Sequence, residues 1–221
     1  IRDNIFCMKN YKKTVLACYL GSISQAIIAN FITLLFFRFH EYYSISYSKL
    51  ALIPTTFFVA QILVDIFCAK FVDLIGQRIC IVFSEILSGV GLILLAILPN
   101  VMPNTFVGII ISVIIYAIGS GLIEVLASPI IEACPFENKD KVMSVLHSFY
   151  CWGVVGTIVI STIFFNIFGI ENWPILACIF ACIPLFNIYN YATCPIESVT
   201  GEEKGLSILN LFKVPSFWLS L

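Results

Sequence analysis

Ionisable side chains inside the long apolar runs of the sequence are the first candidates for chemistry. Glu124 lies deep in the apolar run 105–132. If that run crosses a membrane, a carboxylate at this depth costs about 2.5 kcal/mol or more, and such acids usually serve a cavity, an ion path or a proton relay. Burial favours the protonated form of a carboxyl group, which suits Glu124 to carry a proton. The alternative is a neutral glutamate that hydrogen-bonds a neighbouring helix.

Three further ionisable residues are candidates for supporting roles. His147 stands near the start of the apolar run 142–168, where it could donate to a solute hydroxyl, exchange protons with Glu124, or serve as an interfacial structural residue. Asp65 and Glu85 lie toward the ends of two other runs, close to a charged segment. We expect this pair to belong to a structural charge network there rather than to bind a solute.

A site for a polar organic solute also needs aromatic surfaces with amide, hydroxyl or imidazole partners. The apolar runs offer five such candidates, namely Gln25, Asn30, Tyr116, Tyr150 and Trp152. Aromatic residues make up 14% of the chain, so any one ring can instead face lipid or another helix.

The elements that must position these residues are predicted by the composition. Apolar residues make up 60% of the 221 residues, charged residues only 11%, and the mean hydropathy is +1.02. A backbone in lipid must satisfy its hydrogen bonds internally, and runs of about 20 apolar residues without strand alternation do so as helices. The sequence therefore predicts an all-α membrane protein whose transmembrane helices cover 14–38, 48–71, 79–98, 105–132, 142–168 and 172–193.

The charges predict the orientation of these helices. With the amino terminus in the cytoplasm, Arg38 and Lys49 are the two exceptions among 12 Lys and Arg residues to the rule that cations stay inside. The links 99–104 and 169–172 are short and carry no cation, as expected of the outer face. We predict a multi-pass protein of the inner (plasma) membrane with reduced cysteines, no metal and no cofactor.

The order of the segments suggests a larger plan. We expect residues 1–193 to form a six-helix transporter half, 194–213 a cytoplasmic linker and 214–221 the start of a seventh helix. This layout matches folds built from two six-helix halves, each consisting of two inverted three-helix repeats. The predicted partners are therefore the lipid bilayer and a carboxy-terminal half.

The link between the second and third helices carries a recognisable motif. The segment Ala69-Lys-Phe-Val-Asp-Leu-Ile-Gly-Gln-Arg78 resembles the major facilitator superfamily signature G-x-x-x-D-R-x-G-R-R at the same loop. Asp73, Gly76 and Arg78 match it, whereas Ala69, Leu74 and Gln77 depart from it. A flexible glycine between an acid and a base suits a tight turn that locks an inner gate. The alternative is an ordinary charged turn.

A second resemblance covers segments 119–129 and 146–153, which are similar to the fucose permease branch of that superfamily. Members of this branch are proton-coupled sugar symporters, so the resemblance implies sugar and proton transport, and Glu124 falls at the family's helix-four proton-binding acid. The family's helix-one acid aligns near Ile32, where this sequence has no carboxylate.

Taken together, these features predict a secondary transporter that takes up a sugar or similar small polar solute with protons by alternating access. The alternatives are a drug or metabolite exporter of the same superfamily and a non-transporting membrane scaffold or sensor. No basic patch suggests nucleic acid. No residues at catalytic or metal-binding spacing suggest an enzyme.

Overall fold

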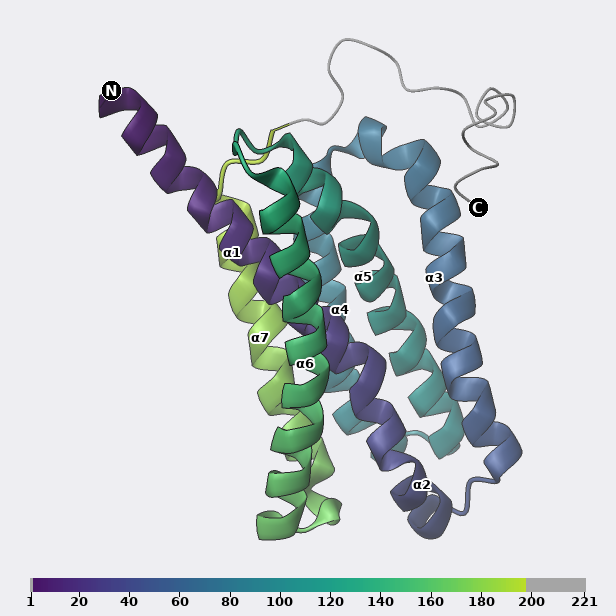
Figure 1. Cartoon of the computed structure of the whole chain (residues 1–221). Coiled ribbons are helices and arrows are strands. Elements are labelled where there is room, and N and C mark those ends of the chain that lie inside the picture. Colours follow the sequence, from purple (N-terminus) through teal and green to yellow (C-terminus); the bar gives the residue numbers. More distant parts are fainter. Residues whose placement is uncertain (1, 198–221) are drawn as a thin grey trace.

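Helices make up nearly all of the described part of the chain, residues 2–197, in a computed structural model (Figure 1). The side chains of residues 2–10, 69, 70 and 73 lie outside this description. In chain order the elements are α1 (Arg2–Phe31), the 3-10 turn η1 (Ile32–Leu35), α2 (Phe36–Tyr43), α3 (Tyr47–Ile75), α4 (Gln77–Val101), α5 (Thr105–Ala133), α6 (Lys139–Phe168), the 3-10 turn η2 (Ile170–Asn172) and α7 (Trp173–Thr193).

Six of the resulting segments are long and apolar enough to cross a membrane. The first joins α1, η1 and α2 over Tyr11–Tyr43, and the last joins η2 to α7 over Ile170–Thr193. Within residues 2–197 no strand is present. The all-α fold with six membrane-spanning helices is therefore confirmed. The linker predicted for 194–213 and the seventh helix predicted for 214–221 lie outside the described residues beyond residue 197.

The helix ends differ from the expected ones, most clearly at Pro99. We expected a link over 99–104, but α4 continues to Val101 and the link is correspondingly shorter. Pro99 lacks one backbone N–H, which removes a single hydrogen bond near the end of the helix. The Met102 amide still donates to the Leu98 carbonyl at 3.0 Å, so the last turn stays closed.

Glycines allow the helices to approach closely. A Cβ on Gly91 of α4 would lie 2.6 Å from the Tyr116 Cβ of α5, and one on Gly119 of α5 would lie 2.6 Å from the Ser84 carbonyl oxygen of α4. Such short distances mean that the two helices meet nearly backbone to backbone. The α4–α5 pair therefore forms a closely packed centre for the bundle.

The other helices pack around this centre in related pairs. Helix α1 packs on α6, and α5 packs on α3, while α4 also contacts α7 and α1 also contacts α5. Two inverted three-helix repeats, α1, α3 and α4 and then α5, α6 and α7, produce this pattern. Exchanging the repeats turns the α1–α6 pair into the α5–α3 pair and leaves the α4–α7 and α1–α5 pairs unchanged. In Figure 1, α1 crosses the bundle obliquely and α3 stands at one edge.

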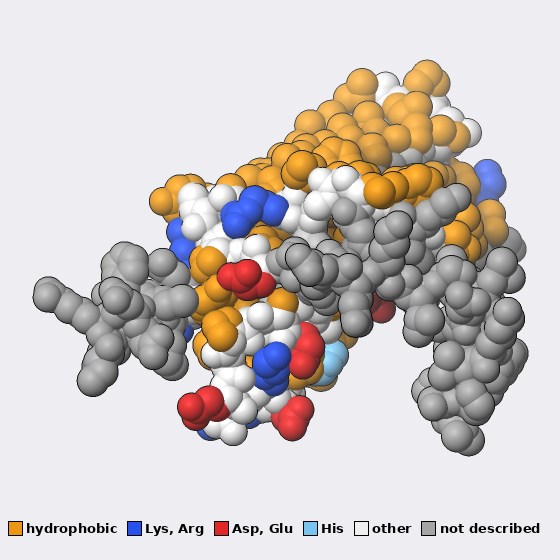
Figure 2. Space-filling view, turned by 90° about the horizontal axis from the view of Figure 1, so that it is seen from above, with side chains coloured by type: hydrophobic (Ala, Val, Ile, Leu, Met, Phe, Trp, Pro, Cys, Tyr) orange, Lys and Arg blue, Asp and Glu red, His pale blue; other side chains and the backbone are white. Residues whose placement is uncertain are grey.

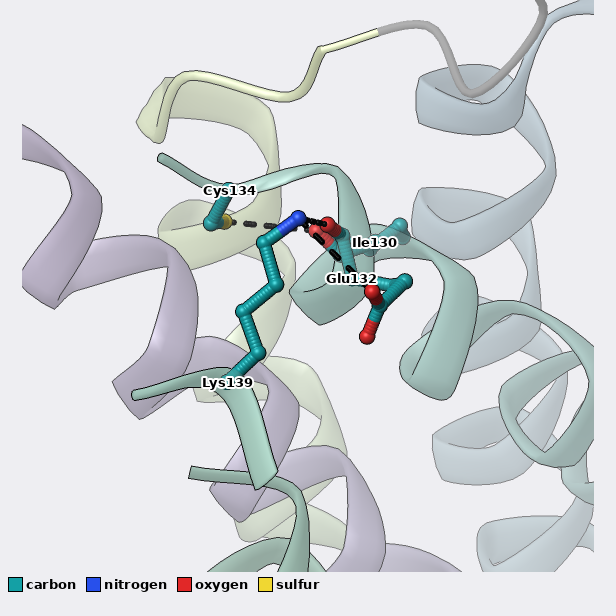
Figure 3. Close-up of polar contacts among 4 residues, drawn as sticks. All are labelled: Ile130, Glu132, Cys134 and Lys139. Atoms are coloured by element: carbon teal, nitrogen blue, oxygen red, sulfur yellow. Dashed lines mark hydrogen bonds and ion pairs between the residues drawn. The ribbon is translucent and has the colours of Figure 1, made fainter. Parts of the chain in front are cut away.

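The turn between α5 and α6 is held by Lys139 (Figure 3). Its Nζ donates to the Glu132 carbonyl oxygen at 2.5 Å and lies 3.7 Å from the Glu132 Oε1. The neighbouring Cys134 thiol donates to the Ile130 carbonyl at 3.2 Å. Burial raises the pKa of Cys134 to about 11, so its thiol keeps its proton at neutral pH.

The surface separates polar from apolar residues. Figure 2 shows Lys, Arg, Asp and Glu side chains gathered on the end face of the bundle, with hydrophobic side chains covering the flank behind it. Large apolar side chains on α3 and α6, such as Ile62 and Ile163, are more than half exposed. An apolar flank with a charged end is what a lipid environment requires.

Candidate solute cavity

A cavity of about 480 Å³ opens between α1, α3, α5 and α6. Its volume lies in the range of small-molecule sites. Its walls combine hydroxyl, amide, carboxyl and imidazole groups with three aromatic rings. The lining residues are Ser22, Gln25, Ala29, Asn30, Phe57, Phe58, Gln61, Ser120, Ile123, Glu124, Ala127, Ser128, Leu146, His147 and Tyr150.

Glu124 is the acidic group in this lining, and two amides hold it. Gln61 Nε2 on α3 donates to Glu124 Oε2 at 2.7 Å, and Gln25 Nε2 on α1 donates to the same oxygen at 3.1 Å. Hydrogen bonds to a charged acceptor are stronger than neutral ones. The carboxyl group therefore links three helices, α1, α3 and α5, at the cavity wall.

The charge around this carboxyl group is negative. Of the Lys and Arg side chains that the structure describes, none lines the cavity. Asp65, one helical turn beyond Gln61 on α3, is exposed and near enough to interact electrostatically with Glu124. Two acids without a lining cation make this part of the wall unfavourable for anionic solutes.

Another part of the lining comes from α6 and the end of α1. His147 and Tyr150 lie one turn apart on α6, and both line the cavity. The Tyr150 hydroxyl interacts with the Asn30 side chain. The Asn30 amide in turn donates to the Ala26 carbonyl at 2.8 Å, and the Thr33 hydroxyl donates to the Asn30 carbonyl at 2.6 Å.

Asn30 also marks a change in the helix. The 3-10 turn η1 begins two residues later, at Ile32, and interrupts the first span. A short 3-10 stretch inside a helix often marks a functional hinge. Ile32 itself is buried and lies outside the cavity lining, so this turn follows the cavity residue Asn30 without supplying a carboxyl group to the cavity.

Two predicted solute-binding residues lie away from the cavity. Tyr116 is only 1% exposed and packs between Gly91 and the Phe57 ring in the core. Trp152 is 71% exposed on the outer side of α6. Gln25, Asn30, Tyr150, Glu124 and His147 are the predicted residues that the fold brings together.

The predicted gate residues separate into different surroundings. Arg78 Nη1 donates to the carbonyl oxygens of Tyr191 and Ala192, at 3.1 and 3.0 Å, at the end of α7. Gly76 joins α3 to α4 with φ of +97°, a conformation that favours glycine. Glu85 is fully buried and bonds to Asn187 rather than to Arg78. The Asp73 side chain lies outside the described residues, so the gate role of the motif stays a prediction.

Sequence reasoning missed Gln61, the closer of the two partners of Glu124. It lies four residues before Asp65 in an otherwise apolar run, and this spacing places both on one face of α3. Two polar residues at this helical spacing in an apolar run are the feature of the sequence that could have identified Gln61. Phe57 and Phe58 were also missed, because aromatic residues are too frequent here for their positions to be informative.

A bundle of six spanning helices around a polar cavity, with an acid held at its wall, is the architecture of a membrane transporter. The sequence model of the Major Facilitator Superfamily matches residues 16–221, and the chain belongs to this family. It is therefore an integral membrane protein of the secondary transporter class. No curated protein matches the chain.

Proposed function

We propose that the protein takes up a sugar or similar small polar solute together with protons, by alternating access. The carrying observation is the cavity acid Glu124, which two amides from different helices hold at one oxygen. A carboxyl group that gains or loses a proton changes what it can donate and accept. Protonation of Glu124 therefore alters the bonds that join α1, α3 and α5, and this links proton binding to the helix arrangement.

The lining supports an uncharged, hydroxyl-rich solute. Phe57, Phe58 and Tyr150 offer apolar faces, while Asn30 and His147 offer hydrogen-bonding groups on the same wall. This combination fits the alternating C–H faces and hydroxyl edges of a sugar.

Solute counterflow tests this proposal. We expect proteoliposomes that contain the full-length protein to exchange a radiolabelled neutral sugar, and an unlabelled sugar phosphate not to compete, because the acidic wall repels anions. A panel of neutral, cationic and anionic solutes gives the comparison. Exchange of anionic solutes alone would contradict the proposal, and exchange of apolar compounds alone would favour the exporter.

We also propose that the amino terminus and the link between α5 and α6 face the cytoplasm, on the basis of the cation distribution. A cysteine at Val101 should then react with an impermeant thiol reagent on intact cells, whereas one at Glu137 should react only after permeabilisation. Both native residues are exposed. The background should lack the exposed native thiols of Cys151, Cys178 and Cys182. The opposite labelling pattern would invert the orientation.

A further inference from the structure

A second buried carboxyl group, separate from the cavity, lies where α1, α4 and α7 meet. Glu85 of α4 has no exposed surface. Asn187 Nδ2 of α7 donates to Glu85 Oε1 at 2.8 Å and to the Ala17 carbonyl of α1 at 2.9 Å. Asn190 Nδ2 donates to Asn187 Oδ1 at 3.2 Å, which fixes the orientation of that amide. One oxygen of Glu85 is thus part of a chain of hydrogen bonds across three helices.

The other oxygen of Glu85 makes no well-formed hydrogen bond within the part of the chain that the structure describes. Glu85 Oε2 and the Ser24 Oγ of α1 are both buried and both without such a partner, although Ser24 is near enough to interact with the carboxyl group. A proton on Glu85 Oε2 would donate to the Ser24 hydroxyl oxygen and satisfy both atoms at once. Buried polar groups are nearly always paired, so this missing bond calls for an explanation.

The charges around Glu85 also favour a protonated carboxyl group. Among the side chains that the structure describes, the titratable groups that face it are the Cys18 thiol of α1 and the Tyr191 phenol of α7. Both are acids, and neither supplies a positive charge. The cation Arg78, seven residues before Glu85 on α4, donates to carbonyl oxygens at the end of α7. An ionised carboxylate buried without a cation costs several kcal/mol, whereas a protonated one avoids this cost.

Tight packing limits what the cluster can hold. A Cβ on Gly21 of α1 would lie 2.7 Å from the Tyr191 hydroxyl, 3.3 Å from Glu85 Oε1 and 3.4 Å from the Ile123 side chain of α5. The α1 backbone therefore packs directly against the carboxyl group, and the Ile123 side chain occupies the space toward α5. A proton fits this arrangement, whereas a hydrated or multiply coordinated metal ion needs more oxygen ligands and more room.

We propose that Glu85 is a second proton-binding carboxyl group, protonated in this conformation, which joins α1 to α4 and α7 through Ser24 and Asn187. Helix α1 also carries Gln25, which bonds to Glu124 in the cavity. The proton on Glu85 thereby fixes the helix that positions the cavity acid. Glu85 is a positioning residue, and its link to coupling rests on the proposed function, whereas the proton site itself does not.

Infrared spectroscopy of the full-length protein in lipid tests the site directly, because a protonated carboxyl group has its own C=O stretching band. We expect the parent protein to show a protonated-carboxyl band that Glu85→Gln loses. The same band should persist in Glu124→Gln. A band that is unchanged by Glu85→Gln, or no such band in the parent protein, would overturn the proposal.

A second pair of variants tests the site even if Glu85→Gln does not fold. Ser24→Ala removes the acceptor of the Glu85 proton, so the band should move to higher frequency. Ser84→Ala is the matched control, because Ser84 adjoins Glu85 on α4 but its hydroxyl donates to the Ile81 carbonyl at 2.6 Å. That variant should leave the band in place. Equal spectra for both serine variants would contradict the pairing of Ser24 with Glu85, and a failure of coupled transport alone would not alter these bands.

Discussion

Replacing Glu124 by Gln in the full-length protein should abolish solute accumulation driven by a pH gradient, while solute exchange across the membrane continues. Glutamine keeps the size of the side chain but cannot be titrated, so no proton can be carried at this position. Counterflow needs no net proton movement, because the loaded carrier only has to reorient. Accumulation and counterflow should be measured in the same vesicles, and accumulation should fall to the level of protein-free vesicles.

The matched control for this variant is Glu132→Gln on the same helix. Glu132 is exposed at the end of α5 beside Lys139 and lies outside the cavity (Figure 3). The Glu132→Gln variant removes one carboxyl group, as the test variant does. It should nevertheless retain accumulation, because the surface ion pair contributes little. Full accumulation in Glu124→Gln would show that the cavity acid is structural. The search for the coupling group would then move to Asp65 and Glu85.

The six-helix fold could be predicted because the bilayer imposes it. Long apolar runs leave no choice of secondary structure in lipid, so the number and order of the spans follow from the sequence. Helix ends are less determined, because a helix can continue past the apolar region into water. The chain at Pro99 and Asn100 is an example, since it remains helical where composition suggested a link.

The cavity could be predicted only in part, because composition does not give the rotation of a helix about its axis. Helix α5 is apolar on nearly all sides, so its pattern does not separate the buried Tyr116 from the cavity residue Glu124. Helix α6 carries Tyr150 and Trp152 two residues apart, and one faces the cavity while the other faces outward. Only tertiary packing decides between these faces.

The attachment of α6 depends on such packing. Of the six membrane-spanning segments, α6 has the smallest share of buried residues, and the helix that it mainly contacts is α1. The contact point is Gly153, where a Cβ would lie 2.8 Å from the Ala26 Cβ and 3.2 Å from the Ile23 Cα of α1. A Cβ on Gly156, one turn further along α6, would meet no atom of another described helix within 4 Å. Of these two glycines, the first is the one that close helix approach requires.

Gly153→Ala should therefore destabilise the protein, whereas Gly156→Ala should leave it unchanged or slightly more stable. Alanine favours a helix over glycine by up to about 1 kcal/mol at either position, but overpacking at Gly153 costs about 1–3 kcal/mol and outweighs that gain. Thermal unfolding of the purified variants should show a midpoint several degrees lower for Gly153→Ala alone, at about 2–4 °C per kcal/mol. Because α6 carries His147 and Tyr150, the same variant should bind the transported solute more weakly in counterflow titrations. Equal midpoints and equal solute affinities for the two variants would mean that α6 is not held to α1 at Gly153.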